Sequence, residues 1–162
     1  PNQKLDIQHI GNRRTRSDML AAGESDALIG AIAPASLYSS NNVTRLFPDY
    51  HQVERAFFAR TGIFPAMHAL VMREELYRKN RWLATSVYKA CEESKRLSLA
   101  QTRFTGALRF MLPWLPEALE EIDEVFGGDP WRYGIKDNVK TLDAFNQALV
   151  ADQFLPALMS LD

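Results

Sequence analysis

One histidine stands alone in the most apolar stretch of the chain. From Ile63 to Met72 every residue is apolar except His68. Histidine is suited to proton transfer because its unperturbed pKa of ~6.5 lies near working pH. Two interpretations of His68 are open. It is either a catalytic acid or base that faces a cleft, or a core histidine that is hydrogen-bonded to the backbone.

Residues that could bind an anion lie just before this stretch and in an earlier loop. Arg60 and Thr61 could hold a carboxylate, since arginine bonds carboxylates through two parallel hydrogen bonds. The alternative for both is an exposed helix end followed by a turn. Ser36 could line the same cleft, or it is an ordinary loop serine. We assign His9 and His51 to a solvated face or a turn. Three scattered histidines form no recognisable metal motif, so we expect neither a metal nor a cofactor.

Composition sets the class of protein. The chain has 162 residues, 46% hydrophobic and 24% charged, as in soluble globular domains. Its formal charge of -1 gives no case for a nucleic-acid or anionic-membrane partner. No apolar run approaches the roughly 20 residues that cross a bilayer. The single Cys91 excludes an internal disulfide framework. The chain begins with Pro1 rather than Met, and we expect further chain before it.

The elements that must position these residues fall into three sections. Alternating residues from Lys4 to Ile10, a short helix, and a buried strand over 26–30 predict a β-α-β unit and a mainly parallel sheet. A helix that opens at Pro48-Asp49 then leads into Ile63. Apolar residues on both faces of 63–73 predict a long strand that is covered on both sides. Helical spacing after Arg73 predicts helices for most of 74–155, with Pro116 in the first turn of one of them.

Several segments, in order along nearly the whole chain, resemble one known family. They are residues 18–29 (DMLAAGESDALI), 45–50 (RLFPDY), 60–68 (RTGIFPAMH) and 111–116 (MLPWLP), followed by Gly127, Pro130-Trp131 and Tyr133-Gly134. Together they resemble the 4,5-dihydroxyphthalate decarboxylase family. The resemblance implies an α/β fold similar to type II periplasmic solute-binding proteins, with two lobes, a two-stranded hinge and a ligand cleft.

The resemblance also implies a division of the chain. Residues 1–62 would be the C-terminal part of the second lobe, 63–73 the hinge strand that returns to the first lobe, and 74–162 the helical C-terminal part of the first lobe. Such a cleft calls for a polar or cationic contact from the loop at 31–34, which Ile32 or Ala33 cannot supply.

The implied reaction converts 4,5-dihydroxyphthalate to 3,4-dihydroxybenzoate and carbon dioxide, a step of phthalate degradation. A phenol para to the departing carboxylate can push electron density onto the carboxylated carbon, which takes a proton before carbon dioxide leaves. The protein must supply a base or acceptor for the phenol, an acid near the ring carbon, and cations for the carboxylates. His68 is our leading candidate for handling the proton, and the resemblance and its place on the hinge strand support this. Arg60 and Thr61 could hold a carboxylate at the cleft, and Ser36 could line it.

A second function class is left open. The chain could belong to a periplasmic solute-binding protein that captures a small aromatic or other carboxylate for uptake, without chemistry. The decarboxylase would instead be cytoplasmic. A signal peptide ahead of Pro1 would favour the binding protein, and a plain Met start would favour the enzyme. In both cases we expect a small aromatic carboxylate as ligand and neither nucleic acid nor membrane as partner, and a homo-oligomer is left open.

Overall fold

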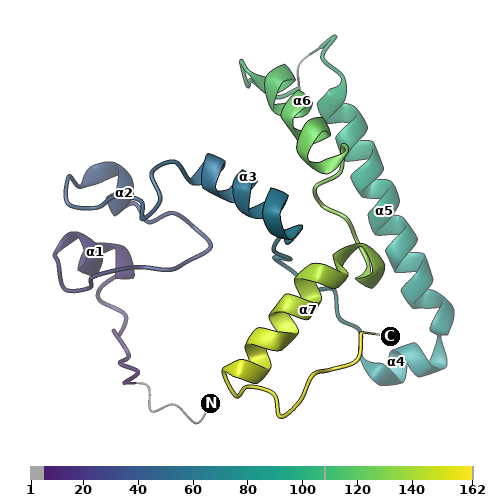
Figure 1. Ribbon diagram of the computed structural model, residues 1–162, viewed down its shortest axis with the longest axis horizontal. Helices are drawn as coiled ribbons and strands as arrows, with labels where there is room; N and C mark the ends of the chain where they lie inside the picture. The colour runs from purple at the N-terminus through teal and green to yellow at the C-terminus, as the bar shows by residue number, and fades with distance from the viewer. Residues whose placement is uncertain (1–5, 108, 162) are drawn as a thin grey trace.

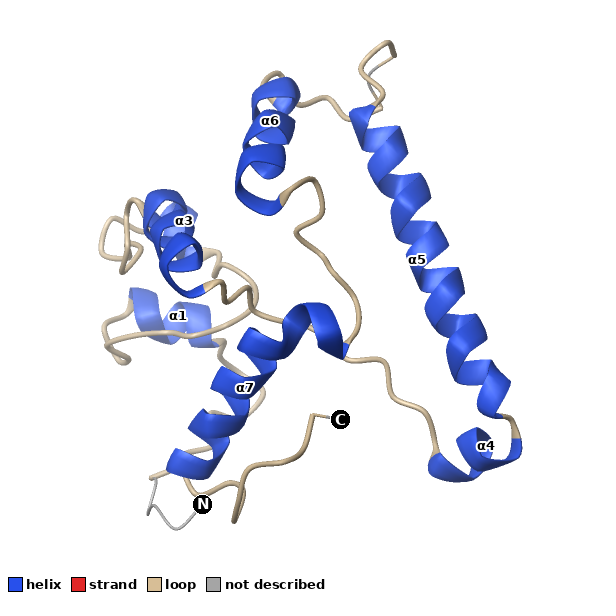
Figure 2. Ribbon diagram, turned by 45° about the vertical axis from the view of Figure 1, so that its right-hand side comes forward, coloured by secondary structure: helices blue, strands red, loops and turns tan. Residues whose placement is uncertain are grey.

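The computed structural model describes residues 6–107 and 109–161, and its regular elements within these ranges are helices (Figures 1 and 2). In chain order they are α1 (Arg16–Ala21), α2 (Ser36–Ser39), α3 (Tyr50–Thr61), α4 (Glu74–Lys79), α5 (Arg81–Arg103), α6 (Leu115–Phe126) and α7 (Ile135–Ala151). None of the described helices is both long and apolar enough to cross a membrane.

The prediction of an α/β fold is wrong, because no strand forms anywhere in the described ranges (Figure 2). Of the first predicted strand, residues 4 and 5 lie outside the described residues, and 6–10 form an exposed loop. Residues 26–30 are also irregular, and Ile29 is 94% exposed. A strand exists only as one member of a hydrogen-bonded ladder, and no described segment pairs with either stretch.

The hinge strand predicted over 63–73 is wrong for the same reason. Residues 62–73 run as an irregular, largely exposed segment between α3 and α4. The main-chain N–H groups of residues 66–72 donate to no other residue that the structure describes. Residues 63–72 are apolar apart from His68, as the sequence shows. This pattern alone does not show which other segments would cover the two faces of a strand. The two-lobed binding-protein fold is therefore not the fold of this chain as described.

The helices predicted after residue 48 are confirmed, and local signals explain where they begin and end. α3 ends at Gly62, whose φ of 67° is the left-handed conformation that glycine adopts readily. α6 carries Pro116 in its first turn and ends at Gly127, with φ 66°. The side chain of Asp49 makes no capping hydrogen bond to α3. A capping box forms at α1, where the side chains of Thr15 and Asp18 each accept from the other residue's main-chain N–H.

Packing between the helices is sparse. Leu115 is the one buried hydrophobic residue among the described residues, and it is still 7% exposed. A cluster of four aromatic rings joins α3, the segment after it, α6 and the loop before α7. Its centroid distances run from 4.7 to 6.3 Å, and its members are Phe58, Phe64, Phe126 and Trp131. In Figure 1, α5 runs along one side of the molecule, α1 and α2 lie on the other, and α7 lies between them.

Candidate functional site

The end of α3 positions two of the predicted site residues. Thr61 lies in the last turn, where its hydroxyl donates to the carbonyl of Phe57 at 2.7 Å and accepts from the N–H of Ile63 at 3.1 Å. These bonds turn the chain out of the helix. The guanidinium of Arg60 lies 5.6 Å from the ring centre of Phe57, a cation–π distance, and its side chain is exposed.

Phe64 fixes the start of the irregular segment that carries His68. Its N–H donates to the hydroxyl of Thr141 on α7 at 3.2 Å, and that hydroxyl donates to the Phe64 carbonyl at 3.0 Å. Beyond Pro65 the segment is exposed, and His68 is exposed with it. No hydrogen bond or ion pair joins His68 to another described residue. The core interpretation of this histidine does not describe the structure, and its catalytic role stays a prediction.

Ser36 is placed apart from the other predicted site residues. It is buried, and its partner is Ser17 of α1, which donates to the Ser36 hydroxyl and accepts from the Ser36 N–H, both at 3.0 Å. These bonds hold α2 against α1. Within the described ranges, no hydrogen bond links any of Ser36, Arg60, Thr61 and His68 to another of the four. Their shared role at a ligand stays a prediction.

A polar pocket that the sequence analysis missed lies between α5, the loop before α7 and the start of α7. Its volume is about 340 Å³. We call it the Lys95 pocket. Its lining combines two phenols, two cations and three carboxylates, namely Tyr88, Glu92, Lys95, Asp129, Arg132, Tyr133 and Asp137.

Lys95 is the centre of this pocket. Its side chain is only 11% exposed, and its ammonium lies 2.7 Å from Asp129 Oδ2, 3.3 Å from Glu92 Oε2 and 3.1 Å from the carbonyl of Trp131. It also lies 4.3 Å from the ring centre of Tyr133. Burial lowers the pKa of Lys95, but the bonds and charges of Asp129 and Glu92 outweigh burial and raise the pKa above its usual value. Lys95 is therefore a charged group that organises the pocket, because its three donors all have acceptors.

Tyr88 contributes one of the two phenols of the pocket. Partial desolvation raises the pKa of its phenol first, and the negative charge and hydrogen bond of Glu92 raise it further. The phenol therefore keeps its proton at neutral pH. A pocket lined by phenols, carboxylates and a fixed ammonium can bind a small polar molecule through hydrogen bonds. No group of described acidic, histidine or cysteine side chains could hold a metal ion.

Little in the sequence indicates the Lys95 pocket. The helical spacing of α5 places Lys95 among charged neighbours, which indicates an ordinary solvated face. Tyr133, in the Pro-Trp-Arg-Tyr-Gly loop, suggests an aromatic residue that packs on a core. The one available signal was Glu92 three residues before Lys95, a spacing that allows an ion pair on a helix. Asp129 lies 34 residues after Lys95, so only the fold brings them together.

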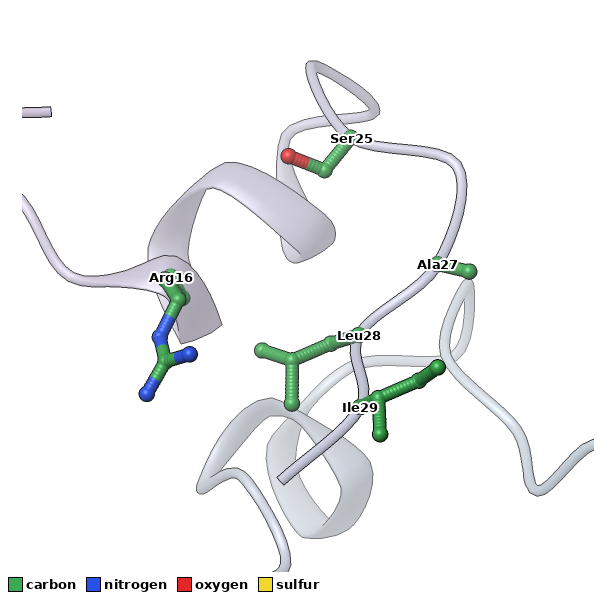
Figure 3. A pocket seen from close by; sticks show the side chains of 5 residues that line it. All are labelled: Arg16, Ser25, Ala27, Leu28 and Ile29. Atoms are coloured by element: carbon green, nitrogen blue, oxygen red, sulfur yellow. The ribbon is translucent and has the colours of Figure 1, made fainter. Parts of the chain in front are cut away.

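A second, smaller pocket lies beside α1. Its volume is about 220 Å³, and its lining is Arg16, Ser25, Ala27, Leu28 and Ile29. Figure 3 shows Arg16 on the helix and Leu28 on the following loop, with both side chains extending toward the same space. One cation beside apolar side chains is a combination that suits a small carboxylate. None of the four predicted site residues belongs to this lining.

Comparison with known proteins supports the resemblance seen in the motifs. No family model matches the chain. A protein of Comamonas testosteroni named 4,5-dihydroxyphthalate decarboxylase is 34% identical over 133 residues, which are 82% of this chain and 40% of that protein. The chain therefore spans less than half the length of this curated relative. An identity of this level over most of the chain supports a relationship to that decarboxylase.

Proposed function

We propose that the chain is part of a decarboxylase that acts on an aromatic carboxylate. The observation that carries this proposal is the 34% identity to 4,5-dihydroxyphthalate decarboxylase over 82% of the chain. We further propose a dihydroxylated aromatic dicarboxylate as the substrate, with 3,4-dihydroxybenzoate and carbon dioxide as products if the substrate is 4,5-dihydroxyphthalate itself.

The chemistry needs a proton at one ring carbon. The phenol oxygen para to the carboxylate gives up its proton as electron density moves to the carboxylated carbon. That carbon accepts a proton, the ring becomes a dienone, and the carbon–carbon bond then breaks so that its electrons restore the aromatic ring. His68 supplies or accepts the proton in this proposal, since its exposed imidazole can meet a ligand.

Arg60 is the proposed carboxylate contact. Its guanidinium rests against the face of Phe57, and no described carboxylate forms an ion pair with it. A substrate carboxylate could therefore take both of its parallel N–H donors, a geometry that lysine cannot reproduce. Thr61 sets the turn that follows Arg60, so its role in the proposal is to position rather than to bind.

The test uses a hybrid in which this chain replaces the matched 40% of the Comamonas testosteroni protein. Carbon dioxide release from 4,5-dihydroxyphthalate is measured for the hybrid and for the unmodified relative. The proposal predicts release by the hybrid and a large loss on Arg60→Gln. A folded hybrid that binds the dicarboxylate but releases no carbon dioxide would overturn the proposal and favour binding without chemistry.

A further inference from the structure

The chain exposes far more surface than a compact protein of its mass. Its accessible area is 13970 Å² for 18.4 kDa. The usual scaling of area with mass gives about 8,200 Å² for a compact protein of this size. Exposed large hydrophobic side chains occur along the whole described sequence, and they include Ile29 at 94%, Leu46 at 87% and Met111 at 97%.

One segment combines this apolar exposure with unpaired main chain. We call residues 66–72 the docking segment. Met67 is 60% exposed, Leu70 76% and Val71 85%. Its main-chain N–H groups donate to no other described residue. The segment is held at both ends, by the Phe64–Thr141 hydrogen bonds before it and by α4 after it. A tethered stretch with free main-chain donors and apolar side chains is suited to bind another polypeptide.

We propose that the docking segment and the apolar surface around it bind a polypeptide equivalent to the 60% of the Comamonas testosteroni relative that lies outside the match. Since 133 residues are 40% of that relative, it is about 330 residues long, roughly twice the length of this chain. The unmatched 60% is therefore about 200 residues, which is longer than this chain. A compact protein of about 200 residues has a surface of about 9,300 Å², which is larger than the excess of roughly 5,800 Å² that this chain exposes.

The size of the exposed surface argues against a second copy as the partner. The excess over a compact protein is roughly 5,800 Å² for one chain. Two copies that covered each other's excess would bury about 11,600 Å², whereas even obligate dimers bury about 2,000–5,000 Å² in total. An area of this size is typical of the interior of one folding unit. The inference rests on surface area and on the length of the relative, and it is independent of the proposed reaction.

The experiment compares the 162-residue chain alone, the chain co-expressed with the unmatched part of the relative, and the hybrid that joins both in one polypeptide. Amide hydrogen exchange of residues 66–72 is the readout, and mass in solution is measured by light scattering. We expect near-unprotected exchange in the chain alone, and a slowing of at least about 100-fold in the complex and in the hybrid. The hybrid allows the contact to be detected even if the two separate polypeptides bind each other weakly, because joining them raises their effective concentration.

Two results would overturn the proposal. One is unchanged fast exchange of residues 66–72 in both the co-expressed pair and the hybrid. The other is protection of these residues in the chain alone, whether as a monomer or as a symmetric dimer. Carbon dioxide release is scored separately, so protection without activity would count against the proposed reaction and not against the interface.

A pair of variants locates the contact. Val71→Asp places a charge in the docking segment and should weaken association with the unmatched part by about tenfold or more. Gln101→Asp makes the same change of charge at an exposed position on α5 and should leave association within about twofold. Equal loss in both variants, or in neither, would show that the docking segment is not the contact.

Discussion

Thr141 and Phe64 are joined by two hydrogen bonds that pass through one hydroxyl. Thr141 Oγ1 accepts from the Phe64 N–H at 3.2 Å and donates to the Phe64 carbonyl at 3.0 Å, across 77 residues of sequence. The single side chain thus satisfies both main-chain groups of a residue whose ring lies in the aromatic cluster. This contact holds the start of the segment with His68 against α7.

Replacing Thr141 with Val should destabilise this junction. Valine keeps the shape of the side chain but leaves the N–H and carbonyl of half-buried Phe64 without their partner, which should lower the free energy of unfolding by about 1–3 kcal/mol. Urea unfolding and the exchange rate of the Phe64 amide measure the effect. Thr85→Val, at an exposed position on α5, is the matched control. Equal unfolding midpoints for the two variants would contradict the assignment.

We expect the stability that Lys95 contributes to the fold to be lost at alkaline pH. Because folding raises the pKa of Lys95 above its usual 10.5, the unfolded chain releases this proton first as pH rises. The contribution of Lys95 is complete below that value and is lost as pH rises through the higher pKa of the folded chain. Tyr88, whose pKa is raised from 10.0, acts in the same direction.

Lys95→Met should therefore be less stable than the wild type at neutral pH, and the difference should shrink as pH rises above 10.5. Urea midpoints across this range measure the change. Lys89→Met removes an exposed lysine from the same helix and should leave the wild-type pH profile in place. A constant difference between wild type and Lys95→Met at every pH would show that the ion pairs of the pocket do not stabilise the fold.

We expect the stability that Asp123 contributes to be lost at acid pH, whereas that of Lys95 is lost at alkaline pH. Arg103 on α5 holds this α6 carboxylate through two hydrogen bonds, to Oδ2 at 2.9 Å and to Oδ1 at 2.5 Å, and the bonds lower the pKa of Asp123 below its usual 3.8. Its contribution is present above pH 3.8 and is lost as pH falls through the lower pKa of the folded chain.

Asp123→Asn should remove that part of the acid sensitivity and loosen α6 from α5. Circular dichroism during acid titration follows the first effect, and amide exchange in α6 follows the second. Glu120→Gln, on the same helix and exposed, is the control. An acid transition of the same midpoint and steepness in Asp123→Asn and wild type would refute the prediction.

His68→Gln should separate catalysis from folding. Gln keeps hydrogen-bonding atoms but does not titrate, so turnover by the hybrid enzyme should fall by on the order of 10²–10⁴. Because His68 is exposed and has no described partner, the thermal stability of the isolated chain should not change. His9→Gln, also exposed, should leave turnover unaltered. Unchanged turnover in His68→Gln would end its assignment as the acid or base.

The Lys95 pocket shows how much of a site the sequence can predict. Glu92 and Lys95 share a helix, so their spacing alone predicts that they can meet. Asp129, Trp131 and Tyr133 reach the same ammonium only because α6 and the loop after it return the chain to α5. Similarly, the buried Ser36 is hydrogen-bonded to Ser17, and no local sequence pattern predicts these hydrogen bonds. Contacts across tens of residues depend on where the helices come to lie.

The sequence by itself determined α3, α5, α6 and α7, because a helix satisfies its hydrogen bonds within one segment and its ends carry local signals such as Gly62, Pro116 and Gly127. It could not decide the fate of residues 63–73. Their apolar pattern suits a strand, yet a strand takes its hydrogen bonds from another segment, and the described chain provides none. Only the tertiary structure decided that this stretch, with His68 in it, stays exposed between α3 and α4.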